Sequence, residues 1–449
     1  MRRSLLGMIA AGLLAATCAP GPVAPPVDLV VLVVVDTLRA DHLGLAGYER
    51  ETSPRFDSWA ERAAVFDRAY SVAPWTLPTF GSLLTGLYPA RHGLGVRRAE
   101  EGYRIDRRLA DGVPMLAERL ARAGLRTAAF VNNPWLRREF QLDRGFELYD
   151  YRRRGRGDTR GNKVVDRALD WLARHQSERA FLLVHLMDPH LPYNAPGDYR
   201  GSFRGEIAPE DRELVRDPAV VRERLPSLSS EQCETITAAY DEEIAFTDAQ
   251  LDRLLSALSD KGLLDRSLVI VTSDHGEELF DHGGFEHGHS TYDELLRVPL
   301  VALAPGVVPG HRSTPVSSVD IPPTILEATG LPLDDVDGRS LWSSLRGDET
   351  QERDRALLVS STLYGPERRA VIAWPYKLSW IPASDERRLV DLDADPEERI
   401  DLSGERPEIV ERLVATLTRA APQASSSYGP QPELDDELID ELEALGYVR

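Results

Sequence analysis

The stretch LVVLVVVDTLRADHLG at residues 29–44 decides the fold. It opens with an unbroken run of Val and Leu, Leu29–Val35, and Asp36 follows this run directly. A run without polar alternation is typical of a strand that is buried on both faces of a parallel sheet. Ligands bind beyond the C-terminal ends of the strands in such sheets, so Asp36 is predicted to lie at a functional edge.

Other apolar runs repeat this pattern along the chain. They are Leu125–Val131, Phe181–Met187, Ser267–Thr272 and Val298–Ala304. Helix-like segments lie between them at Pro114–Ala123, Lys163–Arg174 and Glu231–Ser259. Alternating strands and helices predict an α/β fold, with a mixed and mostly parallel sheet covered by helices on both faces. Asp36, Asp188 and Asp274 each stand one step beyond an apolar run, so these three acids are expected to converge at one edge.

A second informative stretch, VAPWTLPTFGSLLTGLYPARHG, covers residues 72–93. Pro78 suits a first helical turn and Gly86 suits a helix end, so Thr76 is placed at a helix start. The N-terminus of a helix attracts tetrahedral anions, and a hydroxyl held there is a candidate nucleophile for an attack on phosphorus or sulfur. Taken alone, Thr76 is more simply explained as an N-cap residue.

Several further blocks occur in a recognisable order. They are TSDHGE (272–277), HGGFEHGHSTYDELLRVPL (282–300), VSSVDIPPTILEATGLP (316–332), DGRSL (337–341), WPYKL (374–378) and LVDLDADPEERIDLS (389–403). With the two stretches above, the chain resembles the sulfatase branch of the alkaline phosphatase superfamily from about Val27 to the C-terminus. The resemblance implies an alkaline-phosphatase-like fold and a metal-dependent hydrolase of sulfate or phosphate esters.

The acid and imidazole of Asp274 and His275 adjoin at a predicted strand end. Carboxylate oxygens and an imidazole nitrogen suit a divalent cation, so Asp36, Thr76, Asp274 and His275 are predicted to form a metal site. A cation on the hydroxyl would lower its pKa and make Thr76 a nucleophile near neutral pH. The cation is Ca²⁺ by the family pattern, or Zn²⁺ or Mn²⁺ by the histidines, with one or two ions bound.

A second set of polar residues lies in HLMDPHLPY (185–193) and EHGH (286–289). Asp188, His190 and His287 either hold a second ion or contact substrate, and His190 or His287 is predicted to activate the water that releases product. His289 is predicted to contact substrate. Structural roles are expected for His92, His185 and His282.

The chain departs from the sulfatase pattern at several positions. Thr76 stands where sulfatases carry the Cys or Ser that becomes formylglycine, and Thr cannot form that aldehyde. Phe80 replaces an Arg, Thr37 replaces the second acid of an Asp–Asp pair, and Asn132 and Asn133 replace a Lys. These changes favour a phosphate monoester or diester substrate. Asn132 or Asn133 would donate to a substrate oxygen, or else form only the turn before the following proline.

Two alternatives to hydrolysis stay open at this point. One is a transferase, similar to lipoteichoic acid synthases, that moves a phospho-group between envelope molecules. The other is a binding lipoprotein that has the scaffold without catalysis. In every case, the partner is a small-molecule, glycan-linked or lipid-linked anionic ester. The formal net charge of −20, from 53 Lys and Arg against 73 Asp and Glu, argues against nucleic acid as a partner.

The N-terminus, MRRSLLGMIAAGLLAATC, is typical of an export signal, which predicts a bacterial periplasmic or envelope location. Cys18 is expected either to be lipidated as a membrane anchor or to be removed by cleavage nearby. Cys233 is expected to be a buried helix residue. Three parts are predicted: a signal and tether (1–26), a catalytic domain (27–346) and a small α+β subdomain with a terminal helix (347–449). Segment 150–161 is expected to be a surface loop in preference to a substrate clamp, and segment 198–229 a long insertion or a lid near Asp188.

Overall fold

The computed structural model describes residues 27–99, 102–153, 159–348, 355–420, 429–432, 434–445 and 447. The predicted export signal and Cys18 lie outside the described residues. In the part of the chain that is described, no helix combines the length and the apolar character needed to cross a membrane.

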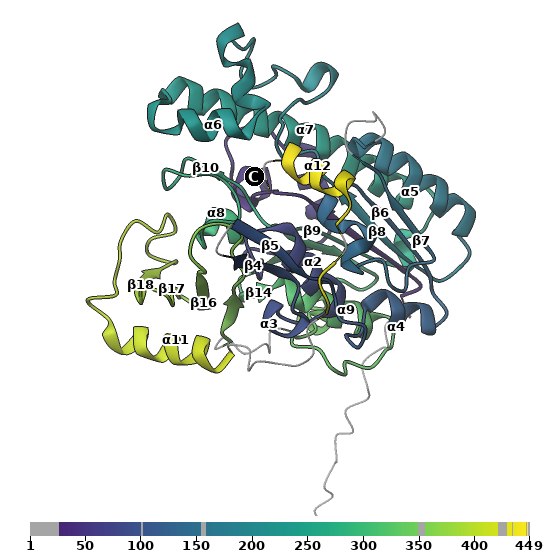
Figure 1. The fold of residues 1–449 in the computed structure, drawn as a ribbon. Helices are drawn as coiled ribbons and strands as arrows, with labels where there is room; N and C mark the ends of the chain where they lie inside the picture. Colours follow the sequence, from purple (N-terminus) through teal and green to yellow (C-terminus); the bar gives the residue numbers. More distant parts are fainter. Residues whose placement is uncertain are drawn as a thin grey trace, which may run out of the picture.

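A mixed eight-stranded sheet forms the centre of the molecule (Figure 1). Its order is β13 (Gly310–Arg312), β2 (Ala64–Phe66), β12 (Leu300–Leu303), β9 (Ser267–Ser273), β1 (Leu29–Val35), β8 (Ala180–Leu186), β6 (Arg126–Val131) and β7 (Leu148–Tyr151). Strand β1 pairs in parallel with β8 on one side and β9 on the other. The predicted α/β fold with a mostly parallel sheet is therefore confirmed.

The direction of β12 departs from the other strands. It pairs antiparallel with both β9 and β2, so the run at Val298–Ala304 does not extend the parallel arrangement. An apolar run predicts that a strand is buried on both faces, but it does not predict the direction of the strand. The direction depends on how the chain returns to the sheet.

Helices cover both faces of the sheet, as β1 shows. Val30, Leu32 and Val34 lie in one core cluster, with residues of α2 (Thr76–Thr85), α4 (Leu116–Arg122) and α9 (Ile321–Ala328). The alternate residues Val31, Val33 and Val35 lie in another cluster, with α1 (Pro54–Ala60), α5 (Gly161–His175) and α7 (Ser230–Asp260). A strand buried on both sides therefore needs the continuous apolar run that the sequence provides.

The chain then forms a separate antiparallel sheet of β15 (Leu357–Val359), β16 (Arg369–Ala373), β17 (Tyr376–Ile381) and β18 (Glu386–Asp391). Helix α11 (Pro407–Ala420) packs on this sheet through Val410, Leu413 and Leu417. The last helix, α12 (Asp436–Ala444), packs elsewhere. Its Leu438 and Leu442 belong to the core cluster of α2, so the end of the chain returns to the large sheet, beyond the boundary predicted at residue 347.

The remaining elements are short. They are α3 (Pro89–His92), α6 (Pro218–Arg224), α8 (Asp293–Leu296), α10 (Trp342–Leu345), β3 (Ala69–Tyr70), β4 (Gly95–Ala99), β5 (Gly102–Arg107), β10 (Glu278–Leu279), β11 (Phe285–Glu286) and β14 (Val316–Ser317). The predicted lid, 198–229, contains α6 and several 3₁₀ turns. Cys233 lies on α7 and is half-buried, so the expectation that it is buried was wrong.

A buried ion cluster joins the small sheet to the large domain. The ammonium of Lys377 on β17 is fully buried, 2.7 Å from a carboxylate oxygen of Asp293 on α8 and 2.7 Å from one of Glu398. Burial lowers the pKa of Lys377, but the two acids outweigh burial and raise it overall. Burial also raises the pKa of Glu398 to about 7.

Lys377→Met should leave these two acids without their cation. Breaking a buried pair by removing one partner costs about 3–5 kcal/mol. The free energy of unfolding, measured in urea, is expected to fall by that order. Arg387→Met is the matched control, because Arg387 pairs with Glu411 at the exposed face of the same sheet. A similar loss in both variants would contradict the role given to Lys377.

Candidate active site

Two adjacent strands deliver two carboxylates to one place. Asp36 follows β1 and Asp274 follows β9, and the strands are in parallel register with Val35 opposite Ser273. Both aspartates are fully buried. Thr37, the residue after Asp36, has a φ of 56°, which a β-branched residue rarely adopts. Its backbone N–H donates a hydrogen bond to Asp274 Oδ1 at 3.3 Å. This strained turn therefore ties the two strand ends together.

Each carboxylate has one oxygen that is held by the protein and one that is not. Asp36 Oδ2 accepts from the Asn133 amide at 2.7 Å and lies 3.1 Å from His185 Nε2. Asp274 Oδ1 accepts from the backbone N–H groups of Thr37 and His275. The other two oxygens, Asp36 Oδ1 and Asp274 Oδ2, are buried and have no hydrogen-bond partner. Buried polar atoms rarely stay unsatisfied, so these two oxygens point to a cation.

The ring of His275 completes this group. Its Nδ1 lies 2.8 Å from the carbonyl oxygen of Gly276, which can only accept a hydrogen bond, so the proton is on Nδ1 and Nε2 has a free lone pair. Nε2 lies 3.4 Å from Asp274 Oδ2 and 3.8 Å from Asp36 Oδ1. Gly276 is needed here because a Cβ would lie 1.9 Å from the carbonyl oxygen of Glu294.

The hydroxyl of Thr76 faces the same point. Thr76 is the first residue of α2, its N-cap is Trp75, and its side chain makes no capping hydrogen bond. Its Oγ lies 3.3 Å from His275 Nε2 and accepts from the Asn133 amide at 3.3 Å. The simpler explanation of Thr76 as an N-cap is therefore wrong, and the side chain is directed into the buried group.

Two residues beside this group have roles that the sequence left open or missed. Asn133 forms the turn through Oδ1, which accepts from Trp135 N, and also donates through Nδ2 to Asp36 and Thr76. His185, expected to be only structural, bridges Asp36 and the Asn132 side chain, 2.9 Å from Asn132 Oδ1. Phe80 packs edge-on against the His185 ring, with centroids 5.4 Å apart. Asn132 thus contacts His185 through Oδ1, and its amide donates to the carbonyl oxygen of Thr159.

The charges of the group support a cation. Burial raises the pKa of Asp36, but its hydrogen bond with His185 opposes this effect, and the pKa is lowered overall. Burial and the Asp36 charge raise the pKa of Asp274 well above its ordinary range. Two buried carboxylates this close disfavour a second negative charge, and a divalent cation would remove that penalty. Among the described residues, Asp36, Asp274 and His275 are the one set whose ligand atoms lie within 4.8 Å of one another.

The second predicted set lies beside the first, in a different arrangement. His190 Nε2 lies 2.6 Å and His287 Nε2 lies 3.2 Å from the hydroxyl of Tyr447, and the His287 ring is 4.4 Å from that of His275. Asp188 Oδ2 accepts from Gly161 N at 2.7 Å. His289 pairs with Glu278 at 2.6 Å. The side chains of His92 and His282 form hydrogen bonds with residues outside the predicted site, which agrees with the structural roles expected for them.

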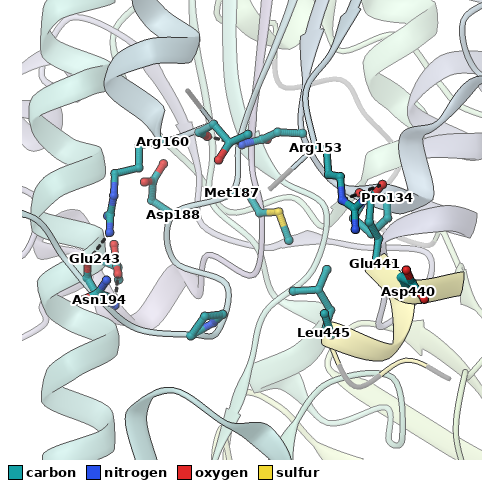
Figure 2. Close-up of a pocket in the computed structure, with 14 residues that line it drawn as sticks. Pro134, Arg153, Arg160, Met187, Asp188, Asn194, Glu243, Asp440, Glu441 and Leu445 are labelled. Atoms are coloured by element: carbon teal, nitrogen blue, oxygen red, sulfur yellow. Dashed lines mark hydrogen bonds and ion pairs between the residues drawn. The ribbon is translucent and has the colours of Figure 1, made fainter. Parts of the chain in front are cut away.

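Asp188 lines a cavity of about 510 Å³, whereas Thr76, His190 and His287 are not among the residues that line it. Figure 2 shows its two walls: Arg160, Asp188, Glu243 and Asn194 on one side, and Asp440, Glu441 and Leu445 at the end of α12 on the other. Asn132, Arg153 and Thr159 also line it. Residues at both ends of the predicted surface loop 150–161 therefore face a cavity, whereas residues 154–158 lie outside the described residues.

Comparison with known proteins agrees with the resemblance in sequence. A family model described as Sulfatase matches residues 28–331. The chain is 25% identical over 448 residues to the arylsulfatase of Clostridium perfringens, covering 83% of this chain and 89% of the relative. It is 25% identical over 431 residues to the choline-sulfatase of Rhizobium meliloti, covering 83% of this chain and 82% of the relative.

Solved structures share the fold. A 2-O GAG sulfatase superposes with a TM-score of 0.72 at 18% identity, covering 88% of this chain and 92% of its own. A phosphonate monoester hydrolase from Silicibacter pomeroyi gives a TM-score of 0.72 at 21% identity, covering 91% and 100%. Fold and matches together define an ester hydrolase with an alkaline-phosphatase-like sheet. The chain belongs to the sulfatase family.

The substitution Asp274→Asn tests the electrostatic repulsion between the two carboxylates. The amide keeps Oδ1 as an acceptor for Thr37 N and removes the charge that burial and Asp36 oppose. In chelator, the variant is expected to be more stable than the wild type by about 1 kcal/mol, measured as the free energy of unfolding in urea.

Added Mn²⁺ or Zn²⁺ is expected to raise the melting temperature of the wild type and not of this variant, since binding to the folded state stabilises it. Equal stabilisation of both proteins by the ion would contradict the placement of a cation between Asp36 and Asp274.

Proposed function

We propose that this protein hydrolyses monoanionic esters of phosphorus or sulfur, with Thr76 as the nucleophile. One observation carries the proposal. The Thr76 hydroxyl, the His275 Nε2 lone pair and the two unsatisfied carboxylate oxygens of Asp36 and Asp274 are buried around one point, at the start of a helix. Nucleophile, electrophilic assistance and an anion-attracting helix start are thereby brought together.

The residues present fit a divalent cation. Asp36 Oδ1, Asp274 Oδ2, His275 Nε2 and Thr76 Oγ would hold it, and one imidazole among oxygen ligands suits Mn²⁺ or Zn²⁺ better than Ca²⁺, which prefers oxygen ligands alone. Such an ion would lower the pKa of the hydroxyl and offset the negative charge of the ester.

The protein groups then perform the reaction in two steps. Thr76 Oγ attacks the phosphorus or sulfur as the alkoxide, after its proton has passed to solvent, and the Asn133 amide donates to a non-bridging oxygen. The bond to the leaving oxygen breaks with its electron pair on that oxygen, which takes a proton from His287, one of the paired imidazoles of His190 and His287. Water, deprotonated by one of these two rings, next attacks the covalent Thr76 ester and restores the hydroxyl.

The nucleophile favours phosphorus over sulfur. The hydrate of formylglycine can expel its ester by re-forming a carbonyl, and this route needs no attack of water on the sulfur. A threonine ester cannot be released by re-forming a carbonyl, so water must attack the phosphorus or sulfur atom itself and displace Thr76. Phosphate and phosphonate esters are known to react in this way with hydroxyl nucleophiles.

The charge of the site favours a monoanion. The Thr76 hydroxyl contacts Asn133 and His275, and Phe80 occupies the position of the sulfatase Arg, packed on His185. A neutral amide and an aromatic ring thus stand where the family pattern has two cations. A site with less positive charge stabilises a phosphodiester or phosphonate monoester better than the dianion of a phosphate monoester.

Thr76→Ala should reduce turnover about 1,000-fold or more, because it removes the atom that forms the covalent ester. Thr76→Ser is the matched control and should keep measurable activity, since it retains the hydroxyl. Steady-state kinetics with a nitrophenyl ester, together with circular dichroism to verify folding, provides the measurement. An active and folded Thr76→Ala protein would eliminate Thr76 as the nucleophile.

A panel of nitrophenyl esters tests the preference for charge and element. The expected order of kcat/KM places the phosphodiester and the phenylphosphonate monoester above the phosphate monoester, and sulfate last, for the reasons of charge and exit route given above. Metal content is measured on the same sample. Turnover of sulfate alone would refute the preference for phosphorus, and no turnover at all would refute hydrolysis of these esters.

A further inference from the structure

The end of the chain reaches the proposed reaction site. Tyr447 follows α12, is 4% exposed, and places its hydroxyl between His190 Nε2 at 2.6 Å and His287 Nε2 at 3.2 Å. Resting on the function proposed above, we infer that Tyr447 is a positioning residue of the reaction: its hydroxyl aligns the two imidazoles that exchange protons with the leaving group and with water.

The hydrogen-bond pattern defines the direction of each contact. His190 Nδ1 lies 2.7 Å from the carbonyl oxygen of Leu191, which only accepts, so Nδ1 is protonated and Nε2 of the neutral ring accepts. The Tyr447 hydroxyl therefore donates to His190 Nε2, and its lone pairs face His287 Nε2. On its other side, His287 Nδ1 lies 2.9 Å from Glu277 Oε1. Each ring is thus fixed at both nitrogens, with the phenol common to the two.

Tyr447 belongs to the main core cluster, together with residues of the helix that precedes it. Its ring packs edge-on against Trp135, with centroids 5.3 Å apart, and Trp135 in turn contacts Trp75, the residue before Thr76. Leu438 and Leu442 of α12 are fully buried in the cluster that also contains α2. Removing this segment would expose an apolar core surface, which argues for a fixed wall of the site rather than a plug that each substrate displaces.

Charged contacts at the surface also hold the helix in place. Arg137 pairs with Asp435 at 2.7 Å, and the Tyr151 hydroxyl bonds to Glu441, which is itself on the cavity wall. Helix α12 contacts the 3₁₀ turn Pro134–Leu136, which directly follows Asn133, and it faces Glu243 of α7 across the cavity (Figure 2). The C-terminal residues 434–445 and 447 therefore complete the proposed site, whose other parts come from distant stretches of the chain.

The reaction defines what Tyr447 contributes. When the bond to the leaving oxygen breaks, that oxygen keeps the electron pair and takes the Nε2 proton of His287, whose Nδ1 takes the proton of the Glu277 carboxyl at 2.9 Å, while Tyr447 keeps its own proton. A misaligned imidazole ring transfers this proton more slowly. The resulting fall in the rate of bond cleavage is large for a leaving group that must be protonated and small for one that departs as a stable anion.

Tyr447→Phe keeps the ring on Trp135 and removes only the hydroxyl. We compare kcat and KM for the phenyl and nitrophenyl esters of one acid. On the phenyl ester, kcat is expected to fall about tenfold or more, with a clearly smaller fall on the nitrophenyl ester and little change in KM. Tyr149→Phe is the matched control, since Tyr149 is also buried and its hydroxyl bonds to the carbonyl of Leu136, away from the site.

Two outcomes would overturn the inference. An equal fall on both esters would assign Tyr447 a structural role, and a rise on both would show that it blocks the site. The imidazole nitrogen resonances, followed by NMR, give a readout that needs no turnover. They should move for His190 and His287 in Tyr447→Phe and stay unchanged in Tyr149→Phe. Unmoved resonances would overturn the inference, even if the wild type hydrolyses none of the esters and the proposed function fails.

Discussion

Two buried carboxylates facing one another are the constraint on which the rest of this structure depends. Asp36 and Asp274 are fully buried, and each exposes one unsatisfied oxygen to the same small space. In a low-dielectric interior, two such charges repel strongly unless a proton or a cation lies between them. The surrounding contacts, from Thr37 N, His185 and Asn133, fix the opposite oxygens and so aim the free ones inward. The fold maintains this unfavourable pair, and its two free oxygens give the proposed cation a binding position.

The sequence predicts the framework that creates this pair, because burial on both faces requires unbroken Val and Leu, as in Leu29–Val35. The convergence of the two aspartates can be predicted from the topology, since adjacent parallel strands end at one edge of the sheet. The direction of β12 and the existence of β18 (ERRLVD) cannot be predicted from the sequence. Strand direction depends on pairings such as Val301 with Val271, and β18 alternates too weakly to stand out from a charged loop.

Two residues of the site could not be predicted from the sequence, because strand register places one of them and the packing of the C-terminal helix places the other. His185 lies in an apolar run, where a satisfied structural histidine is the simpler expectation. Its contact with Asp36 depends on the pairing of His185 with Val34, which no local pattern encodes. Tyr447 follows a short acidic amphipathic helix that is indistinguishable in sequence from many surface helices. Only the packing of Leu438 and Leu442 in the main core brings its hydroxyl to His190.

The departures from the sulfatase pattern form one coherent change once they are placed in space. An Arg beside the nucleophile is needed when a charged aldehyde hydrate must be held, and a Thr nucleophile has no hydrate. Without that need, Phe80 can fill the position and pack on His185, which in turn holds Asp36. Asn133 replaces a cation by a neutral donor that reaches both Asp36 and Thr76. In the proposed reaction, the substrate side of the site therefore carries fewer positive charges than in a formylglycine enzyme, and Thr76 would depend more on a cation held at the carboxylate pair.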